Sequence, residues 1–573
     1  MTLPALAQAR PDDFFIPGLD PGLSLVQLEN LKIGVVPPVR IEALALASNF
    51  EHRVQITDIM ERHARSRWKK GVVFPTVLAV AEDLALRHRL LTIGDKYFMN
   101  SEGGWRMRNS YAGQKNGKAS DAALVAHLAE KSFENRRPLP LFNEDYRQLD
   151  FVIETRNFYN FYHFTKETLP HLTLVERYGL TGRVLIAGPN RKVSDFVMDA
   201  VKAWFPELVD RVEITGDTVD FGRALIGLDT RIMYYQCRDA LIPSIQDVSD
   251  VPVKRRFTTG NLRLASINSY EQPLGDLRQR ALAVLQPAPP SRRLFVVRRS
   301  GRQRNMVGGD LLEARLKDMG FEVVAFEDHT VAEQARMVAE AEAVVLLHGA
   351  GTTNMLYVPE GCLVVELSNL QTLRKRFGDF NPIAIAAGAR YLHVFADHDF
   401  PNPDVVPVIS EDGHRGVVLS SFEADVIASH IASVLDPAPA QQALEACRVL
   451  NDARETAALS AALDVHAAVI SHEADFHVWR ANVASDSGDK IGALEHLRRA
   501  LVLAPGRVPL LTRTLNAAHA QDDRRLMIEA AALFLLRAPR KAEKLFNEKG
   551  WSFEIPLPEA EEAPDWDEGR DDT

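Results

Sequence analysis

The chain has 573 residues, which is more than one hydrophobic core normally serves, so its length predicts two or three domains. Hydrophobic residues make up 46% and charged residues 25%, the composition of an ordinary globular protein. The net charge is -10, but nine acidic residues against one arginine follow from Glu554 onward, so the remainder is nearly neutral. This excludes broad affinity for nucleic acid, and it predicts an acidic disordered tail over 551–573.

The cysteines and the apolar segments indicate a reducing, aqueous compartment. Cys237, Cys362 and Cys447 lie far apart with no CxxC pair, which argues against a disulfide framework or a structural zinc site. No window reaches the roughly 18 to 20 apolar residues that span a bilayer. The start of the chain also lacks the basic and apolar regions of a signal peptide. We therefore expect a cytoplasmic protein without a transmembrane segment, either free or peripheral at the inner face of the membrane.

Residues 1–286 are expected to form an α/β domain with additions at its start. Strands are predicted at Arg183–Ala187 and Val212–Thr215, around a helix over Ser194–Phe205. Short apolar stretches at Val72–Val80 and Leu90–Phe98 are interpreted as antiparallel additions to this sheet.

An aromatic segment from Asn157 to Leu172 is predicted to continue as a helix as far as Gly179. His163 and Glu167 stand four residues apart in it, so they share one helix face. A carboxylate beside a histidine fixes the tautomer of the ring and raises its basicity, which makes His163 a candidate general base. An aromatic core helix with a capped histidine is the alternative interpretation.

Two proline-rich breaks, Pro287–Pro290 and Asp436–Ala440, are interpreted as domain edges. Strands and helices alternate between them, which predicts right-handed parallel crossovers and a Rossmann-like domain over 291–436. The predicted elements are Leu294–Val297, Gly309–Met319, Phe321–Phe326, Val331–Ala341, Ala343–Leu347, Leu363–Leu367, Pro382–Ala387 and Tyr391–Phe395.

A glycine-rich turn follows the predicted strand Ala343–Leu347, at the carboxyl end where open α/β sheets hold their ligands. Glycines let the backbone approach an anion closely, and the amides at the next helix start can hold a diphosphate. The candidate ligand-binding residues of this turn are His348, Gly349, Ala350, Gly351, Thr352, Thr353 and Asn354.

Charged residues follow two other strands of the same predicted sheet. Arg298, Arg299 and Arg304 come after the first strand, where guanidinium groups could grip a diphosphate with paired hydrogen bonds. A solvated basic loop is the alternative. Glu366 ends the strand after the glycine turn, where a carboxylate could accept both hydroxyls of a ribose. It could equally be a surface acid at the end of a strand.

Residues 441–550 are alanine-rich with helical periodicity. Gly488, Ala493, Leu497, Ala500 and Pro505 have the spacing of the later half of a tetratricopeptide repeat. One partial match favours a helical appendage over a complete repeat array. Such helices could bind a protein partner or mediate self-association.

Three blocks of the chain resemble glycosyltransferase family 61 in the order of that family. Asn160–Phe164 with Glu167, Leu169 and Pro170 is similar to its NYYHWxxExLP block. Leu294–Arg299 is similar to its strand that leads into an arginine loop. His348–Met355 with Pro359, Gly361 and Glu366 is similar to its long HGAGxTN block. Phe164 replaces the usual tryptophan, and the arginine loop continues Asn305–Gly309 in place of the usual Asn-Glu helix start, which leaves the donor contacts and the sugar specificity open.

The resemblance implies a GT-B fold of two Rossmann-like domains, followed here by an all-helical appendage. It implies that 1–286 faces the acceptor, that 291–436 holds a nucleotide-sugar donor, and that transfer inverts the anomeric centre without a metal ion. We expect a UDP-sugar donor, a glycan acceptor, no other cofactor, and a place in bacterial capsule or lipopolysaccharide synthesis. His163 would be the base with Glu167 as its partner. Alternatively His163 binds a donor phosphate, and Asp195 or Glu154 is the base.

Two other classes of protein compete with this interpretation. A non-catalytic nucleotide- or glycan-binding protein would use a degenerate core and the helical repeats as its interaction surface. An epimerase or dehydrogenase would need a GxGxxG turn after its first strand, and the chain has none.

Overall fold

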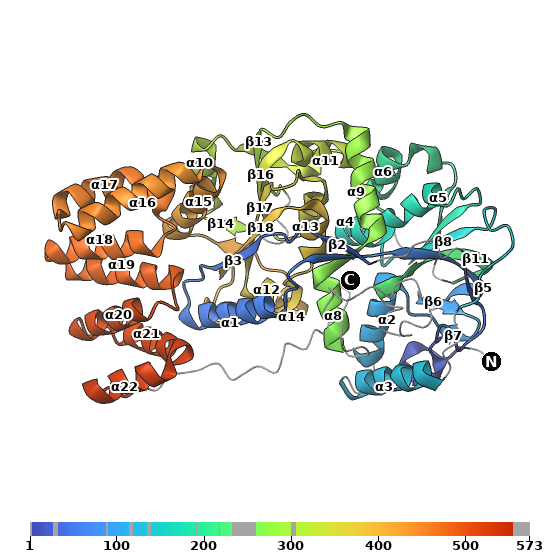
Figure 1. The fold of residues 1–573 in the computed structure, drawn as a ribbon, viewed down its shortest axis with the longest axis horizontal. Coiled ribbons are helices and arrows are strands. Elements are labelled where there is room, and N and C mark those ends of the chain that lie inside the picture. Colours follow the sequence, from blue (N-terminus) through green and yellow to red (C-terminus); the bar gives the residue numbers. More distant parts are fainter. Residues whose placement is uncertain are drawn as a thin grey trace.

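The computed structural model contains two α/β sheets side by side and a run of helices attached beyond the second sheet (Figure 1). The structure describes residues 3–26, 33–87, 90–113, 118–134, 139–188, 193–216, 218–231, 259–299 and 305–553. Most of the acidic tail predicted for 551–573 therefore lies outside the described residues. Among those described, no helix is both long and apolar enough to cross a membrane.

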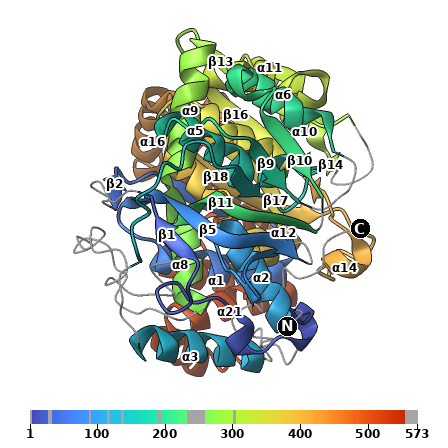
Figure 2. The ribbon, with the colours of Figure 1, turned by 90° about the vertical axis from the view of Figure 1, so that its right-hand side faces the viewer.

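The first sheet combines a parallel half and an antiparallel half (Figure 2). Its parallel strands are β8 (Phe151–Glu154), β9 (Val184–Ala187) and β10 (Val212–Thr215), and α6 (Asp195–Trp204) connects the last two. Val197, Val201 and Trp204 of α6 are fully buried, because helical spacing places them on one face. This confirms the α/β unit that the sequence predicts.

The antiparallel half is built from β5 (Thr76–Arg87), β6 (Leu90–Ile93) and β7 (Lys96–Tyr97). β11 (Val219–Asp229) joins the halves, since it runs parallel to β8 and antiparallel to β5. The predicted antiparallel additions are confirmed for these strands. The start of the stretch Val72–Val80 instead forms β4 (Gly71–Phe74), which belongs to a separate small sheet with β2 (Gly34–Val36) and β12 (Ser269–Glu271).

The second sheet includes β13 (Arg292–Val297) as the last strand but one at one end. β15 (Glu322–Ala325) and β16 (Ala341–Leu347) pair with it on either side, both parallel. β17 (Leu363–Asn369) and β18 (Arg390–His398) extend the sheet beyond β16. The chain winds from β13 to β15 and then crosses back to β16, so the winding reverses between β13 and β16, the usual place for a ligand.

Helices complete this second layer where the sequence predicts them: α10 (Gly309–Asp318), α11 (Val331–Ala339) and α13 (Asn381–Ala387). α12 (Leu370–Arg376) was not expected, and it follows β17 directly. The strands β16 and β17 are buried almost throughout, which is why they read as continuous apolar runs.

The edge of the second sheet includes a strand from the start of the chain. β3 (Ile41–Ala45) pairs in parallel with β18, and α1 (Phe50–Ser66) then packs on α12. These residues fall within the range 1–286 that the sequence groups with the first sheet. β3 and β18 lie about 350 residues apart along the chain, and no short stretch of sequence indicates such a distant pairing, so it could not be predicted. How the chain divides into independently folding domains stays a prediction.

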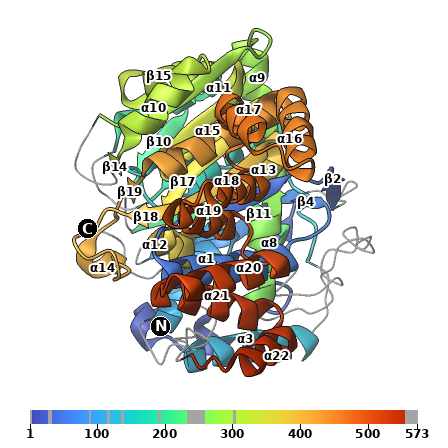
Figure 3. The same ribbon diagram turned by 90° about the vertical axis from the view of Figure 1, so that its left-hand side faces the viewer.

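Seven helices after residue 436 are described, and they stack as antiparallel pairs (Figure 3). The pairs are α16 with α17, α18 with α19, and α20 with α21, followed by α22. Their bounds are α16 Pro437–Asp452, α17 Thr456–Ile470, α18 Ala474–Asp486, α19 Lys490–Leu503, α20 Val508–Ala520, α21 Arg524–Arg537 and α22 Pro539–Lys549. Ala481, Ala493 and Ala500 are buried between α18 and α19, where small side chains let paired helices approach closely. The region is therefore tetratricopeptide-like, as expected.

The second proline-rich break is a corner between two helices. Asp436 ends α15 (Ser421–Leu435) and caps α16, whose first residue is Pro437. Proline suits the first position of a helix, because the amide there needs no partner within the helix.

Candidate functional site

The aromatic segment forms a helical stretch of changing width rather than one regular helix. Its parts are α4 (Phe161–His163), a π-helical turn (Phe164–Thr168), a 3₁₀ turn (Leu169–Leu172) and α5 (Thr173–Arg177). The predicted end near Gly179 is confirmed, but the helical stretch begins at Phe161 rather than Asn157, and the predicted regularity is wrong. Pro170 explains the difference, because a proline inside a helix cannot donate the regular backbone hydrogen bond. π-helical turns occur frequently at functional sites.

His163 and Glu167 form a hydrogen-bonded pair inside this stretch. His163 Nδ1 lies 2.7 Å from Glu167 Oε1, and the histidine is only 5% exposed. Burial lowers the pKa of His163, although Glu167 acts in the opposite direction. Burial favours a neutral Glu167, but His163 and Arg156 outweigh it and lower the pKa of this carboxyl group. The ionised carboxylate accepts from Nδ1 and leaves Nε2 of a neutral ring as a proton acceptor.

The stretch that carries His163 meets the second sheet at Phe380. Tyr162 donates from its hydroxyl to the carbonyl of Asp379 at 3.0 Å, and its ring lies 5.0 Å from that of Phe380. The His348 ring packs on the same Phe380 at 5.5 Å. The structure thus brings together the two histidine blocks that lie about 185 residues apart along the chain.

His348 stands at the carboxyl end of β16 and is held by a carboxylate of the neighbouring strand. Its Nδ1 lies 2.7 Å from Glu366 Oε1, while the Tyr391 hydroxyl donates to Glu366 Oε2. Burial favours a neutral Glu366, but His348 outweighs it and brings the pKa of the carboxyl group to about 2. Glu366 is 2% exposed, so its interpretation as a surface acid is wrong. Both of its oxygens already accept hydrogen bonds within the protein, and Glu366 does not line the cavity described next, so its contact with a ribose stays a prediction.

A cavity of about 900 Å³ opens at the carboxyl ends of β13 and β16, where the winding of the second sheet reverses. Its walls come from both sheets. The second sheet contributes Arg298, Glu327, Gln334, Ala350 and Gly351, and the first contributes Phe161, Asp195, Phe196 and Lys202. Volumes of about 300 to 1,000 Å³ are typical of small-ligand sites.

The expected arginines differ in their placement. Arg298 lines the cavity, and burial lowers its pKa. Arg299 is 71% exposed in its side chain and pairs with Asp328 at 2.6 Å, so the structure does not bring it into the lining. Arg304 lies outside the described residues.

The glycine-rich turn divides into a lining part and a supporting part. Gly349 adopts φ 159° and ψ -175°, a conformation that is essentially restricted to glycine. Ala350 and Gly351 then begin a 3₁₀ helix, η9 (Ala350–Tyr357), at the cavity wall. Thr352, Thr353 and Asn354 are buried behind them, and Asn354 donates to Gln334 at 3.0 Å.

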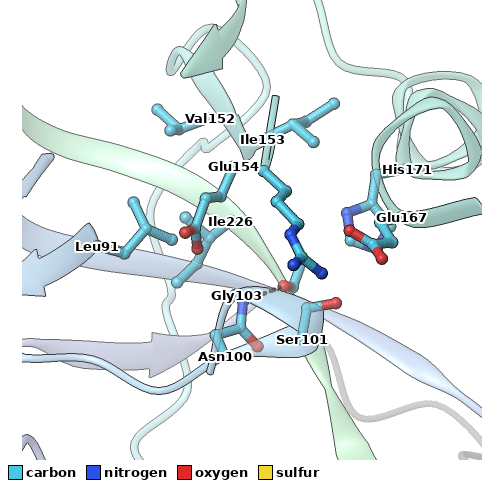
Figure 4. Close-up of a pocket in the computed structure, with 12 residues that line it drawn as sticks. Leu91, Asn100, Ser101, Gly103, Val152, Ile153, Glu154, Glu167, His171 and Ile226 are labelled. Atoms are coloured by element: carbon cyan, nitrogen blue, oxygen red, sulfur yellow. Dashed lines mark hydrogen bonds between the residues drawn. The ribbon is translucent and has the colours of Figure 1, made fainter. Parts of the chain in front are cut away.

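A second, much smaller pocket of about 20 Å³ lies behind Glu167. Glu154 and Glu167 border it from opposite sides, with Ser101 below them (Figure 4). Asn100, Arg156 and His171 complete its polar lining. This volume admits about one water molecule and no sugar ring.

A buried ionic network next to this pocket was missed by sequence reasoning. His171 Nε2 lies 3.3 Å from Glu271 Oε2, and Arg231 pairs with both Glu271 and Asp229. Glu271 lies 100 residues from His171 and 40 from Arg231, so no local motif connects it with them. Among the described residues, no group of three or more His, Cys, Asp or Glu side chains is arranged to hold a metal ion.

The fold and the site define a protein of two mixed α/β sheets, in an arrangement consistent with the GT-B fold, with a run of helices at its C-terminal end. Residues 161–365 match the family model described as Glycosyltransferase 61, and the chain therefore carries a glycosyltransferase domain of this family. Both histidine blocks and Arg298 lie in or directly before the matched range.

Two further comparisons complete this result. A comparison with curated proteins found no match. Among solved structures, "Crystal structure of MamA" is similar at 15% identity with a TM-score of 0.18, covering 23% of this chain and 80% of that chain.

Proposed function

We propose that the protein transfers a sugar from a nucleotide-sugar donor to a glycan acceptor with inversion at the anomeric carbon. The observation that carries this proposal is the meeting of His163, backed by Glu167, with the glycine-rich turn at the edge of a ligand-sized cavity. Such a layout supplies a base from one sheet and a cradle for an anion from the other.

The donor diphosphate occupies the cavity at the end of β13 and β16. Arg298 gives it a positive charge, and the amides that begin η9 at Ala350 and Gly351 point their dipoles toward it. His348 precedes these amides in the same turn, beside the lining rather than within it, and completes the cradle. Arg299 is a weaker candidate for binding the diphosphate than the sequence suggests, because it already pairs with the negative charge of Asp328. Glu366 acts through His348 rather than on the ribose.

His163 acts as the general base. Its Nε2 removes the proton of the acceptor hydroxyl, whose oxygen attacks the anomeric carbon while the bond to the diphosphate oxygen breaks. Glu167 stabilises the imidazolium that forms. Asp195 lines the cavity and is the alternative base. Glu154 is a weaker alternative, because its pocket is too small for a sugar.

The charge that grows on the leaving diphosphate is balanced by Arg298, His348 and backbone amides. Fixed donors of this kind stabilise a transition state without moving during the reaction. On this basis we propose transfer that needs no metal ion, from a UDP-sugar. The resemblance of the sequence supports an acceptor in bacterial capsule or lipopolysaccharide synthesis at the cytoplasmic side. Any protein partner would bind the outer surface of the helices after residue 436.

A panel of nucleotide sugars tests the proposal. Thermal shift identifies the donor, since a bound ligand raises stability by RT ln(1 + [L]/Kd). The selected donor is then assayed with and without EDTA, both for slow hydrolysis and for transfer to glycan fragments. Turnover that survives EDTA and disappears in Arg298→Ala supports the proposal. Tight binding of a nucleotide sugar without any turnover would instead favour a non-catalytic binding protein.

A further inference from the structure

We propose that Tyr391 is a positioning residue for the transfer reaction: it holds Glu366 on His348 rather than on His393, and so aims Nε2 of His348 at the donor diphosphate. The reaction step rests on the function proposed above. The hydrogen-bond selection itself rests only on the geometry around Glu366.

Glu366 lies between two histidines that can both reach the same oxygen. His348 Nδ1 is 2.7 Å from Glu366 Oε1, and His393 Nδ1 is 3.9 Å from that atom. Glu366 and His393 are opposite each other in the register of β17 and β18, so their side chains are neighbours. A small rotation of the carboxylate would shorten the distance between Oε1 and His393 Nδ1. The protein therefore contains a competitor for the partner of His348.

His393 is a strong competitor because, among the described residues, neither of its ring nitrogens has a hydrogen-bond partner. It is 3% exposed, and neither ring nitrogen makes a hydrogen bond within the described part of the chain. Its ring stacks on Phe395 and meets Phe377 edge-on, so it can turn only within an aromatic slot. Burial lowers its pKa to about 4, so the ring is neutral and carries one N–H that needs an acceptor.

Tyr391 decides this competition by anchoring the second oxygen. It stands two residues before His393 on β18, so both side chains leave the same face of the strand. Its hydroxyl donates to Glu366 Oε2, and burial raises the pKa of Tyr391 well above 10, so the proton stays in place. With Oε2 fixed, the carboxylate cannot rotate Oε1 toward His393.

The consequence for His348 is a defined orientation. Nδ1 donates to an ionised carboxylate, which fixes the orientation of the ring, and the proposed reaction assigns the opposite nitrogen, Nε2, to the donor diphosphate. The titratable and charged groups that face Glu366 or its partners are His348, His393, Tyr391, Arg67, Asp379 and Tyr162.

The test compares Tyr391→Phe, His393→Phe and the double variant in the full-length protein. Tyr391→Phe should lower kcat by about ten- to hundredfold, the size expected when one hydrogen bond to a charged group is lost. The basic limb of its kcat profile should move to lower pH, because His348 without its carboxylate holds the proton less firmly. KM for the donor should change much less. Adding His393→Phe should restore most of kcat, since the competitor is gone.

Tyr97→Phe is the matched control. It also removes a buried tyrosine hydroxyl that donates a hydrogen bond, here to the carbonyl of Pro4, but far from the second sheet. It should leave kcat and its pH profile unchanged. A Tyr391→Phe enzyme with the wild-type pH profile, or a double variant no better than Tyr391→Phe, would overturn the proposal.

Histidine ¹⁵N spectra separate this proposal from the proposed function. The His348 signal, assigned by its loss in His348→Gln, should show the Nδ1–H form in wild-type protein and a mixture in Tyr391→Phe. That result supports the selection by Tyr391 even if no nucleotide sugar is turned over. An unchanged His348 signal in an active enzyme contradicts the selection and leaves the proposed function intact.

Discussion

His163 and His348 each direct Nδ1 at a buried carboxylate 2.7 Å away, one on each side of the meeting point at Phe380. Each carboxylate is held below its ordinary pKa by its histidine, against the effect of burial. Two such pairs can divide the proton chemistry of one transfer reaction. In the proposed reaction, His163 takes a proton from the acceptor and His348 supports the departing diphosphate.

The two members of the first pair should have separable effects. His163→Ala should lower kcat by about 10²- to 10⁴-fold, the usual contribution of a general base, with donor binding retained. Glu167→Gln should lower kcat less and also move the acidic limb of the kcat profile to lower pH. The sign follows because Glu167 raises the pKa of His163, and its removal lets the base stay neutral further into acid. A rate within twofold of wild type in His163→Ala would assign the base elsewhere, with Asp195→Asn as the next variant.

Arg298 and Arg299 form a matched test of the cavity. Arg298→Gln should raise the donor KM by about ten- to hundredfold, as expected for loss of one charged hydrogen bond. Arg299→Gln should have little effect, because that arginine is exposed and already paired with Asp328. Initial rates with varied donor at saturating acceptor measure both. An equal increase of the donor KM in Arg298→Gln and Arg299→Gln would indicate that the diphosphate binds outside the cavity.

Arg53 ties the start of the chain to its helical end. It donates to the carbonyl of Ala47 at 2.7 Å and pairs with Glu529 of α21, and both charged side chains are buried. Burial lowers the pKa of Arg53 to about 10. Arg53→Ala leaves Glu529 buried without its partner, which should cost about 3 to 5 kcal/mol of unfolding free energy.

Urea denaturation followed by circular dichroism measures this loss. Arg448→Ala is the control, because it breaks an exposed pair with Glu445 on α16 and should leave the urea midpoint nearly unchanged. Replacing both buried partners, as in Arg53→Met with Glu529→Leu, should recover much of the stability. Equal midpoints for Arg53→Ala and Arg448→Ala would contradict a structural role for the buried pair.

Buried histidines predict a loss of stability in mild acid. Burial, followed by the charge of His496, lowers the pKa of His477 to about 3, and burial with His472 lowers that of His430 to about 4. An unfolded histidine titrates near 6.5, so the folded state resists protonation. The unfolding free energy should therefore be constant above about pH 6.5 and fall below it, by up to about 1.4 kcal/mol per pH unit for each histidine.

Thermal unfolding between pH 7.5 and 4.5 measures this dependence. His477 packs between Phe422 of α15 and His496 of α19, so the loss should include the junction between the second sheet and the helices. His477→Gln should reduce the slope of the midpoint against pH. A midpoint that rises on acidification would show that the rings are already charged in the fold.

The parts of the fold that could be predicted depend on short stretches of chain. The spacing of His163 and Glu167 on one helical face was enough to expect their contact, and the apolar runs of β16 and β17 were enough to expect the second sheet. The glycine-rich turn identified the cavity wall at Ala350 and Gly351 in the same way.

The parts that could not be predicted depend on partners distant in sequence. Glu366 was expected to hold a ribose, because nothing near it in the chain reveals that Tyr391 and His348 occupy its oxygens. Arg298 and Arg299 are the same residue type side by side, and the fold separates them by burying Arg298 at the cavity and pairing the exposed Arg299 with Asp328. Pro170 could have signalled the irregular helix, since its missing amide is visible in the sequence.

The pairing of β3 with β18 has a consequence for synthesis of the protein on the ribosome. Ile41 pairs with Tyr391, and Arg53 pairs with Glu529. The N-terminal strand and helix therefore leave the ribosome long before the residues they pair with have been synthesised. At about 5 to 20 residues per second, these delays last roughly 20 to 95 seconds. During this time an unpaired strand and an apolar helix face are exposed to other nascent chains. Coexpression with a holdase chaperone, which covers exposed apolar segments during synthesis, should therefore raise the yield of folded protein.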